Sequence, residues 1–177
     1  MPEEIDPDTT SCIVVGVTRS QRDSVIATAA KLAELFSVPL VCAHVDPGRY
    51  ETALNPDGTM ESSPIDPDIV EDPTTAFDAD WREHIRSLVS NGTKIIYRDL
   101  AGDVAQALGE EADQLGAEMI VVGSRTGGIG ASVQEFFRGS PAVHLAHRQW
   151  RPVVIVPVSP THPDHPLPWE TEHGHPG

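Results

Sequence analysis

A glycine-rich stretch that closes with a serine is the part of the sequence best suited to chemistry. It runs from Gly123 to Ser140 as GSRTGGIGASVQEFFRGS, directly after the apolar residues 117–122. Glycine lets a backbone approach a ligand closely, and the helix N-terminus after such a loop presents N–H groups to an anion. The stretch therefore predicts a phosphate-binding loop, with a plain turn between a strand and a helix as the alternative. Gly139 and Ser140 favour the loop, because a glycine inside a helical pattern suggests close approach of a ligand or of another backbone.

Other chemical motifs are missing from the sequence. There is no GxxxxGK[ST] phosphate loop, and the glycine-rich stretch does not follow the first predicted strand as a dinucleotide-binding fingerprint would. No GxSxG motif occurs and neither Cys12 nor Cys42 has an evident base, so we expect buried free thiols and no nucleophile. His144 and His147 share a helix face and further histidines lie in the tail, but their spacing matches no closed zinc site. No metal site is predicted.

The composition disfavours several classes of partner. The chain has 177 residues, which suits one domain, and a formal net charge of −15. General nucleic-acid binding is disfavoured, because that affinity comes mainly from Lys and Arg side chains that neutralise phosphates. No segment approaches the eighteen or so apolar residues needed to cross a bilayer, and no basic region followed by a long apolar run opens the chain. We expect a soluble, cytoplasmic protein.

Strands and helices alternate along the chain and position the glycine-rich loop. Apolar runs rich in β-branched residues predict strands at 12–17, 38–45, 94–100, 118–122 and 152–158. Helical spacing predicts helices at about 19–36, with Ser20 as N-cap, and at about 77–88, 103–116 and 131–147. This alternation indicates an α/β fold with a parallel sheet covered on both faces, which binds ligands beyond the carboxyl ends of its strands. The glycine-rich loop follows the fourth strand and is expected at that edge.

One domain is predicted over residues 11–158. Residues 1–10 and the Pro- and His-rich tail 159–177 are expected to be disordered. Residues 46–76 interrupt the alternation and are rich in Pro, Asp and Ser. Such a composition buries little apolar surface, so a disordered acidic insertion is predicted there, with a functional lid as the alternative.

Several segments together resemble the universal stress protein family. They are CIVVGVTRSQRDSVIATAAKLAEL, LVCAHV, DLAGDVAQAL, AEMIVVGSR and GSPAVHLAHRQWRPVVIVPV, in this order, and they cover residues 11–158 outside the insertion. The resemblance implies a five-stranded parallel sheet sandwiched by about four helices, Rossmann-like and similar to the adenine nucleotide alpha hydrolases. It also implies a homodimer paired through the last strand, from Arg151 to Val158.

The resemblance also implies a nucleotide site, here with a degenerate motif. Family members that bind ATP carry Gly, two residues, Gly, nine residues, Gly and then Ser or Thr, with an aspartate after the first strand. When the pattern is anchored at Gly127 and Gly130, the interval to Gly139 is one residue too short. Thr18 stands where the aspartate is expected.

The function implied is that of a universal stress protein that binds ATP or a related adenine nucleotide in a regulatory rather than catalytic role, with Mg²⁺ only as a companion of the nucleotide. The site would lie between the ends of the first, second and fourth strands. Its predicted residues are Val17, Thr18 and Val45 on the adenosine side and, in the glycine-rich loop, Gly123, Ser124, Arg125, Gly127, Gly130, Gly139 and Ser140.

Two other functions are weighed against this one. The first is a dimeric interaction or adaptor module whose pocket binds no nucleotide, and whose acidic insertion contacts a protein partner. The second is an enzyme on a related fold, such as a nucleotidyl transferase or an ATP pyrophosphatase. It is disfavoured because TRSQRDS after the first strand lacks the glycines of a pyrophosphate-binding loop, so at most a weak ATPase is expected.

Overall fold

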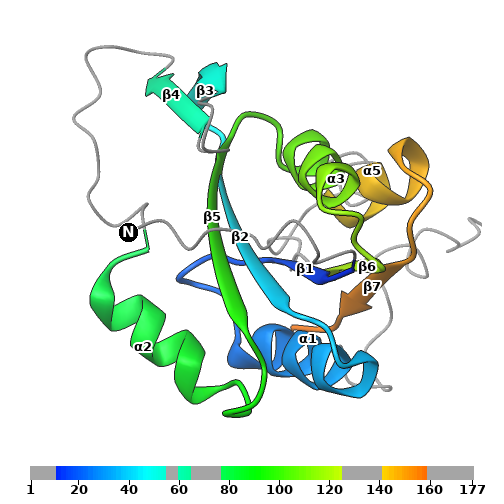
Figure 1. The fold of residues 1–177 in the computed structure, drawn as a ribbon. Coiled ribbons are helices and arrows are strands. Elements are labelled where there is room, and N and C mark those ends of the chain that lie inside the picture. The colour runs from blue at the N-terminus through cyan, green and yellow to red at the C-terminus, as the bar shows by residue number, and fades with distance from the viewer. Residues whose placement is uncertain (1–10, 55–59, 65–76, 125–140, 159–177) are drawn as a thin grey trace, which may run out of the picture.

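The fold is a parallel sheet with helices on both faces, seen in a computed structural model that describes residues 11–54, 60–64, 77–124 and 141–158. Five strands form the sheet in the order β5-β2-β1-β6-β7, and every pair is parallel. Their bounds are β1 Ile13–Gly16, β2 Leu40–Asp46, β5 Ile95–Ala101, β6 Met119–Gly123 and β7 Val153–Val156 (Figure 1). The predicted fold class is confirmed.

Strand β1 lies at the centre of this sheet. Ile13 pairs with Leu40 of β2 on one side and with Met119 of β6 on the other. Successive side chains of a strand point to opposite faces, and both faces here are covered by helices, which is why β1 is apolar throughout. Ile13 and Val15 contact one core cluster, and Val14 contacts the other.

Among the described residues, two helices cover each face of the sheet (Figure 1). Helices α1 (Asp23–Phe36) and α2 (Ala79–Ser87) lie on the face of Ile13 and Val15. Helices α3 (Val104–Gln114) and α5 (Pro141–Arg148) lie on the face of Val14. No described helix is both long and apolar enough to span a bilayer.

Helix α1 begins later than the sequence predicts. Ser20 was the predicted N-cap, but the helix starts at Asp23 and its N-cap is Arg22, whose side chain makes no capping hydrogen bond. The reason is a turn that precedes the helix, in which the Gln21 N–H donates to the Thr18 carbonyl at 3.1 Å. By contrast, the N-cap of α3 is Asp103, whose side chain accepts from the Gln106 N–H at 2.9 Å. Of the helix predicted at 131–147, residues 131–140 lie outside the described residues.

A two-stranded hairpin lies within the segment for which no regular structure was predicted. Strands β3 (Arg49–Leu54) and β4 (Met60–Pro64) pair antiparallel, with a register shift between Glu51 and Ala53. The expectation of an unstructured insertion at 46–76 is therefore wrong for these two strands, because strand pairing supplies the backbone hydrogen bonds that the composition alone does not indicate. The hairpin stands beyond the ends of β2 and β5 (Figure 1). Residues 1–10, 55–59, 65–76 and 159–177 lie outside the described residues.

Candidate functional site

A pocket of about 520 Å³ opens at the carboxyl edge of the sheet, where β1, β2 and β6 end. Such a volume suits a small-molecule ligand, since ligand pockets run from roughly 300 to 1,000 Å³. Its position agrees with the general rule for parallel sheets, whose ligands bind beyond the carboxyl ends of the strands. The lining residues are Gly16, Val17, Thr18, Ser20, Gln21, Arg22, Ala43, Val45, Val104, Leu108, Val122, Gly123, Ser124 and Val158.

Half of the site residues predicted from the sequence meet in this pocket. Val17 and Thr18 follow β1, and Val45 lies near the end of β2. Gly123 is the last residue of β6, and Ser124 follows it. The other predicted residues lie outside the described residues; they are Arg125, Gly127, Gly130, Gly139 and Ser140.

One side of the pocket is apolar. Val45 and Ala43 come from β2, Val122 from β6 and Leu108 from α3, and all four side chains are buried. Gly16, in β1, belongs to the same wall, because a Cβ placed on it would lie 3.0 Å from Cδ1 of Leu108. The missing side chain therefore lets Leu108 pack directly onto the backbone of β1, where both residues line the pocket.

The other side of the pocket is polar and is built by the loop from Thr18 to Arg22. The Thr18 N–H donates to Oε1 of Gln21 at 3.1 Å, which satisfies one backbone donor of the loop from within it. Nε2 of Gln21 is buried and has no hydrogen-bond partner among the described residues. An amide donor in that state is costly, and it lies in the wall of a pocket that can hold an acceptor.

Strand β7 contributes to the mouth of the pocket through Ser124. The Ser124 N–H donates to the Val156 carbonyl at 2.8 Å, and its hydroxyl oxygen accepts from the Val158 N–H at 3.0 Å. A Cβ on Gly123 would lie 3.0 Å from Cγ1 of Val158 and 3.2 Å from Cγ2 of Val25. A side chain at position 123 would therefore crowd Val25 of α1 and Val158, which follows β7.

Helix α2 holds the polar loop from the outside. Arg19 forms an ion pair with Asp78, and its guanidinium lies 5.0 Å from the centre of the Trp81 ring. Asp78 also caps α2 by accepting from the Trp81 N–H at 2.8 Å, and this bond, together with Arg19, lowers the pKa of the Asp78 carboxyl. The loop is therefore fixed on its outer side by a charged and an aromatic contact.

His44 supports the backbone at the start of the same loop. Its Nδ1 lies 3.1 Å from the Val17 carbonyl, and its ring packs edge-on against Trp81 at 5.5 Å and Phe77 at 6.3 Å between centroids. The Nε2 atom is buried and has no hydrogen-bond partner among the described residues. His44 lies behind Val17, and the pocket lining does not include it.

Two helices begin at the pocket. Arg22 and Val104, which line it, are the N-cap of α1 and the first residue of α3. The N-terminal end of a helix carries a partial positive charge that favours anions. Although the chain has a net charge of −15, none of the described lining residues is Asp or Glu, and Arg22 is a cation. The described part of the pocket therefore favours an anion.

The lining residues that sequence reasoning missed fall into three groups. Ser20, Gln21 and Arg22 belong to the loop between β1 and α1, next to the predicted Thr18. Gly16, Ala43 and Val122 lie close to predicted residues, near the carboxyl ends of the same strands. The predicted strand ends could therefore have identified them. Val104 and Leu108 come from α3, and Val158 follows β7. Only the order of the strands brings these elements to the pocket.

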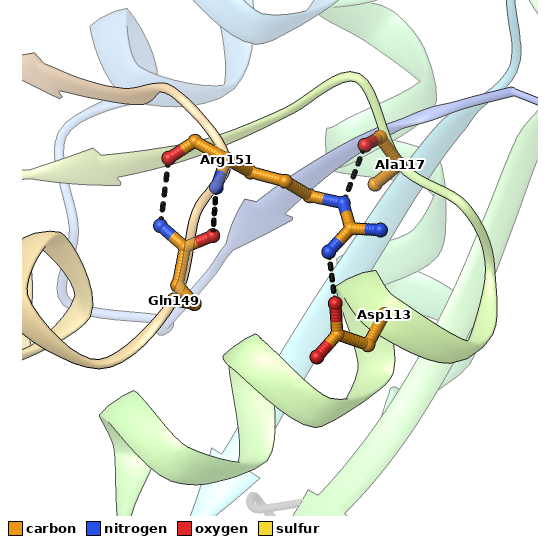
Figure 2. Close-up of polar contacts among 4 residues, drawn as sticks. All are labelled: Asp113, Ala117, Gln149 and Arg151. Carbon is orange, nitrogen blue, oxygen red and sulfur yellow. Dashed lines mark hydrogen bonds and ion pairs between the residues drawn. The ribbon is translucent and has the colours of Figure 1, made fainter.

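At the amino ends of the strands, opposite the pocket, Arg151 joins the segments before β6 and β7 (Figure 2). Its Nε donates to the Ala117 carbonyl at 2.7 Å, and its Nη1 forms an ion pair with Asp113 of α3. The Gln149 side chain donates to the Arg151 carbonyl at 2.7 Å and accepts from the Arg151 N–H at 2.6 Å. This network fixes the starts of β6 and β7. The end of β6, and Val158 just after β7, line the pocket.

Neither cysteine is suited to nucleophilic chemistry. Both are buried free thiols, as predicted. Burial raises the pKa of Cys12 to about 11, with Glu111 as the next cause, and burial raises the pKa of Cys42 to about 12. The thiolate form is therefore scarce near neutral pH.

Comparison with known proteins gives one family and one fold. The universal stress protein family model matches residues 11–157. A universal stress protein solved in complex with cAMP is 22% identical, with 84% of this chain and 98% of that chain covered and a TM-score of 0.56. A universal stress protein from Archaeoglobus fulgidus is 24% identical, with 82% and 93% covered and a TM-score of 0.51. Another, from Archaeoglobus fulgidus DSM 4304, is 18% identical, with 88% and 47% covered and a TM-score of 0.58. No curated protein matches the chain.

Proposed function

The chain belongs to the universal stress protein family, and from this premise we propose that its pocket binds ATP or a related adenine nucleotide in a regulatory rather than catalytic role. One observation carries the proposal. In a strongly acidic chain, the described lining of the pocket has an apolar wall on one side, and on the other a polar loop with Arg22 and no carboxylate.

Each half of the pocket matches one half of a nucleotide. A purine ring is a flat, largely apolar group, and the wall of Ala43, Val45 and Leu108 offers buried apolar surface of that kind. Phosphate groups are anionic and suit the positive ends of helices, here the starts of α1 and α3. The relative in complex with cAMP holds an adenine nucleotide, which is the ligand class we propose.

A binding role rather than a catalytic one is proposed from the side chains of the pocket. Thr18, Ser20 and Ser124 supply hydroxyl groups, but the described lining contains no His, Asp, Glu or Cys that would take a proton from them. That Gly127, Gly130, Gly139 and Ser140 hold the phosphates stays a prediction from the sequence.

The nucleotide proposal is tested by identifying what the purified protein carries. The protein is denatured, any released nucleotide is identified by chromatography and mass spectrometry, and binding of ATP, AMP and cAMP is measured by calorimetry. Ligand at about 100 times its Kd should stabilise the fold by about 2.7 kcal/mol in a melting experiment. No released nucleotide and no binding at millimolar concentration would refute the proposal and favour an interaction module with a vestigial pocket.

A pocket variant with a matched control makes this test specific. Val104→Glu places a carboxylate in the lining at the first position of α3, where the helix itself favours a negative charge. Gln106→Glu adds the same charge to an exposed position of the same helix outside the lining. Val104→Glu should abolish nucleotide binding while α3 stays folded, and Gln106→Glu should bind as the wild type does.

We further propose that the chain forms a homodimer through the segment Arg151 to Val158. Its strand, β7, ends the order β5-β2-β1-β6-β7, so one of its edges pairs with no other described strand. Ile155 in this strand is 49% exposed, and Trp150 just before it is fully exposed. An open edge with exposed apolar side chains is the kind of surface that a second copy covers.

A further inference from the structure

We infer that this pocket takes its nucleotide without a divalent metal ion, and that Arg22 supplies the counter-charge for the phosphates. The inference rests on the proposed function, because it states in which ionic form the nucleotide binds there. It departs from the expectation that Mg²⁺ accompanies the nucleotide.

The first step concerns the oxygen ligands that Mg²⁺ requires. Protein sites hold Mg²⁺ next to phosphates through one or two carboxylates. The described lining of the pocket offers three hydroxyl groups and one amide, from Thr18, Ser20, Ser124 and Gln21, but no carboxylate. Across all described residues, no group of three or more His, Cys, Asp or Glu has the arrangement of a metal site.

The second step concerns carboxylates next to the lining in the sequence. There are three of them, and each is engaged elsewhere. Asp23 lies 2.8 Å from Nε2 of His84, Asp46 accepts from the Gly48 N–H at 2.8 Å, and Asp103 accepts from the Gln106 N–H as the cap of α3. Recruiting any of them for a metal ion would cost a contact that stabilises a turn, a helix end or an inter-helix pair.

The third step concerns the arginines of the polar loop. Arg19 is held on the far side of the loop by Asp78 and Trp81. Arg22 is exposed, lines the pocket at the N-terminus of α1 and makes no ion pair with another described residue. A guanidinium in this position can donate two parallel hydrogen bonds to a phosphate, which an ammonium cannot do with the same geometry.

The consequence is a competition between Mg²⁺ and Arg22 for the same phosphate oxygens. Mg²⁺ in solution binds the triphosphate of ATP and lowers its negative charge, whereas it binds AMP only weakly. Added Mg²⁺ should therefore weaken the binding of ATP to this protein and leave the binding of AMP unchanged.

The experiment is calorimetry of ATP and AMP binding to the full chain, first in excess EDTA and then in excess MgCl₂. We expect ATP to bind more tightly in EDTA and AMP to bind equally in both. Arg22→Gln should weaken ATP binding in EDTA about tenfold, the loss of one charge-assisted contact. Arg22→Lys should retain part of the affinity, and Arg148→Gln, the same change at an exposed position of α5 outside the lining, should retain all of it.

Three results would overturn the inference, and the third differs from the other two in its meaning. If Mg²⁺ tightens ATP binding, or if Arg22→Gln binds ATP as the wild type does, the pocket binds nucleotide but not in the manner inferred. If neither nucleotide binds in either buffer, the proposed function fails as well. Thr18→Asp provides a positive control, because a carboxylate placed in the lining should turn the effect of Mg²⁺ on ATP binding from weakening to tightening.

Discussion

Thr18 and Gln21 close the loop at the mouth of the pocket by bonding to each other in both directions. The Thr18 N–H donates to Oε1 of Gln21, the Gln21 N–H donates to the Thr18 carbonyl, and both distances are 3.1 Å. The loop is thus shaped by one side chain and one backbone turn. It needs neither glycine nor a metal ion to hold its form.

Gln21→Glu should keep this loop but weaken nucleotide binding. The new carboxylate still accepts from Thr18, while its negative charge enters a lining that has none in its described part. Repulsion of a phosphate at close range costs ~1–2 kcal/mol, which is about a tenfold loss of affinity. Calorimetry with AMP and a urea titration measure the two properties separately. Equal affinity of variant and wild type would show that the phosphates lie elsewhere.

Gly16→Ala should destabilise the fold, whereas Gly109→Ala should not. The new Cβ at Gly16 would lie 3.0 Å from Leu108, so we expect a cost of about 1–3 kcal/mol from overpacking. A Cβ at Gly109, inside α3, would have its nearest neighbours at 3.9 Å, and the helix should gain about 0.5–1 kcal/mol. The free energy of unfolding in urea is the measurement. Similar losses in the two variants would contradict the packing of Leu108 on β1.

Arg151→Met should cost more stability than removal of its ionic partner. The variant leaves the Ala117 carbonyl without its donor from Arg151, for which we expect about 1–3 kcal/mol. Asp113→Ala removes only an ion pair whose carboxylate side is 67% exposed, so its cost should stay below about 1 kcal/mol. Urea titrations of both variants decide between the carbonyl and the ion pair. A larger loss in Asp113→Ala would reverse this ranking.

Ile155→Lys should convert the proposed dimer to a monomer. Ile155 is exposed on the edge strand β7, so a charge there costs the monomer little but would be buried between two copies. Leu35→Lys is the control, since Leu35 is 70% exposed on α1. Analytical ultracentrifugation should give a monomer for the first variant and the wild-type mass for the second. A wild-type chain that sediments as a monomer would refute the dimer.

Asp78 should make stability fall in acid. Its pKa in the folded protein is lowered, chiefly by the Trp81 N–H and then by Arg19, so it stabilises the fold at pH values above its ordinary pKa of 3.8. That contribution is lost as the pH falls through the lowered folded value. Asp78→Asn keeps an N-cap but has no charge to lose, so its stability should fall less between about pH 5 and pH 2. Parallel curves for variant and wild type would exclude Asp78 as a source of acid sensitivity.

Local patterns in the sequence were sufficient for the elements and for part of the site. The apolar runs located β1, β2, β5, β6 and β7, which needs only the side-chain pattern of each strand. Val17, Thr18 and Val45, which the family resemblance assigned to a nucleotide site, lie at strand ends and line the pocket; their role in binding stays a prediction.

The remaining features depend on contacts between distant segments. Val104 and Leu108 line the pocket only because β1 lies between β2 and β6, beneath α3. Ser20 satisfied every local requirement of an N-cap, yet the turn from Thr18 to Gln21 delays the helix to Asp23. In β7 the Val154 side chain packs against the core cluster of α1, and Ile155 is the exposed residue. The helix that covers a short edge strand determines which of its side chains point toward the core.

The central position of β1 also determines when the pocket can exist during synthesis. Its first neighbour, β2, follows after one helix, but its second neighbour, β6, begins only at Met119, and Val158 of the lining comes later still. A nascent chain that leaves the ribosome can pair β1 with β2 early, but the other edge of β1 stays open until nearly the whole domain has emerged. A ligand of this pocket, such as the proposed nucleotide, can therefore stabilise only the nearly complete domain and not the early steps of folding.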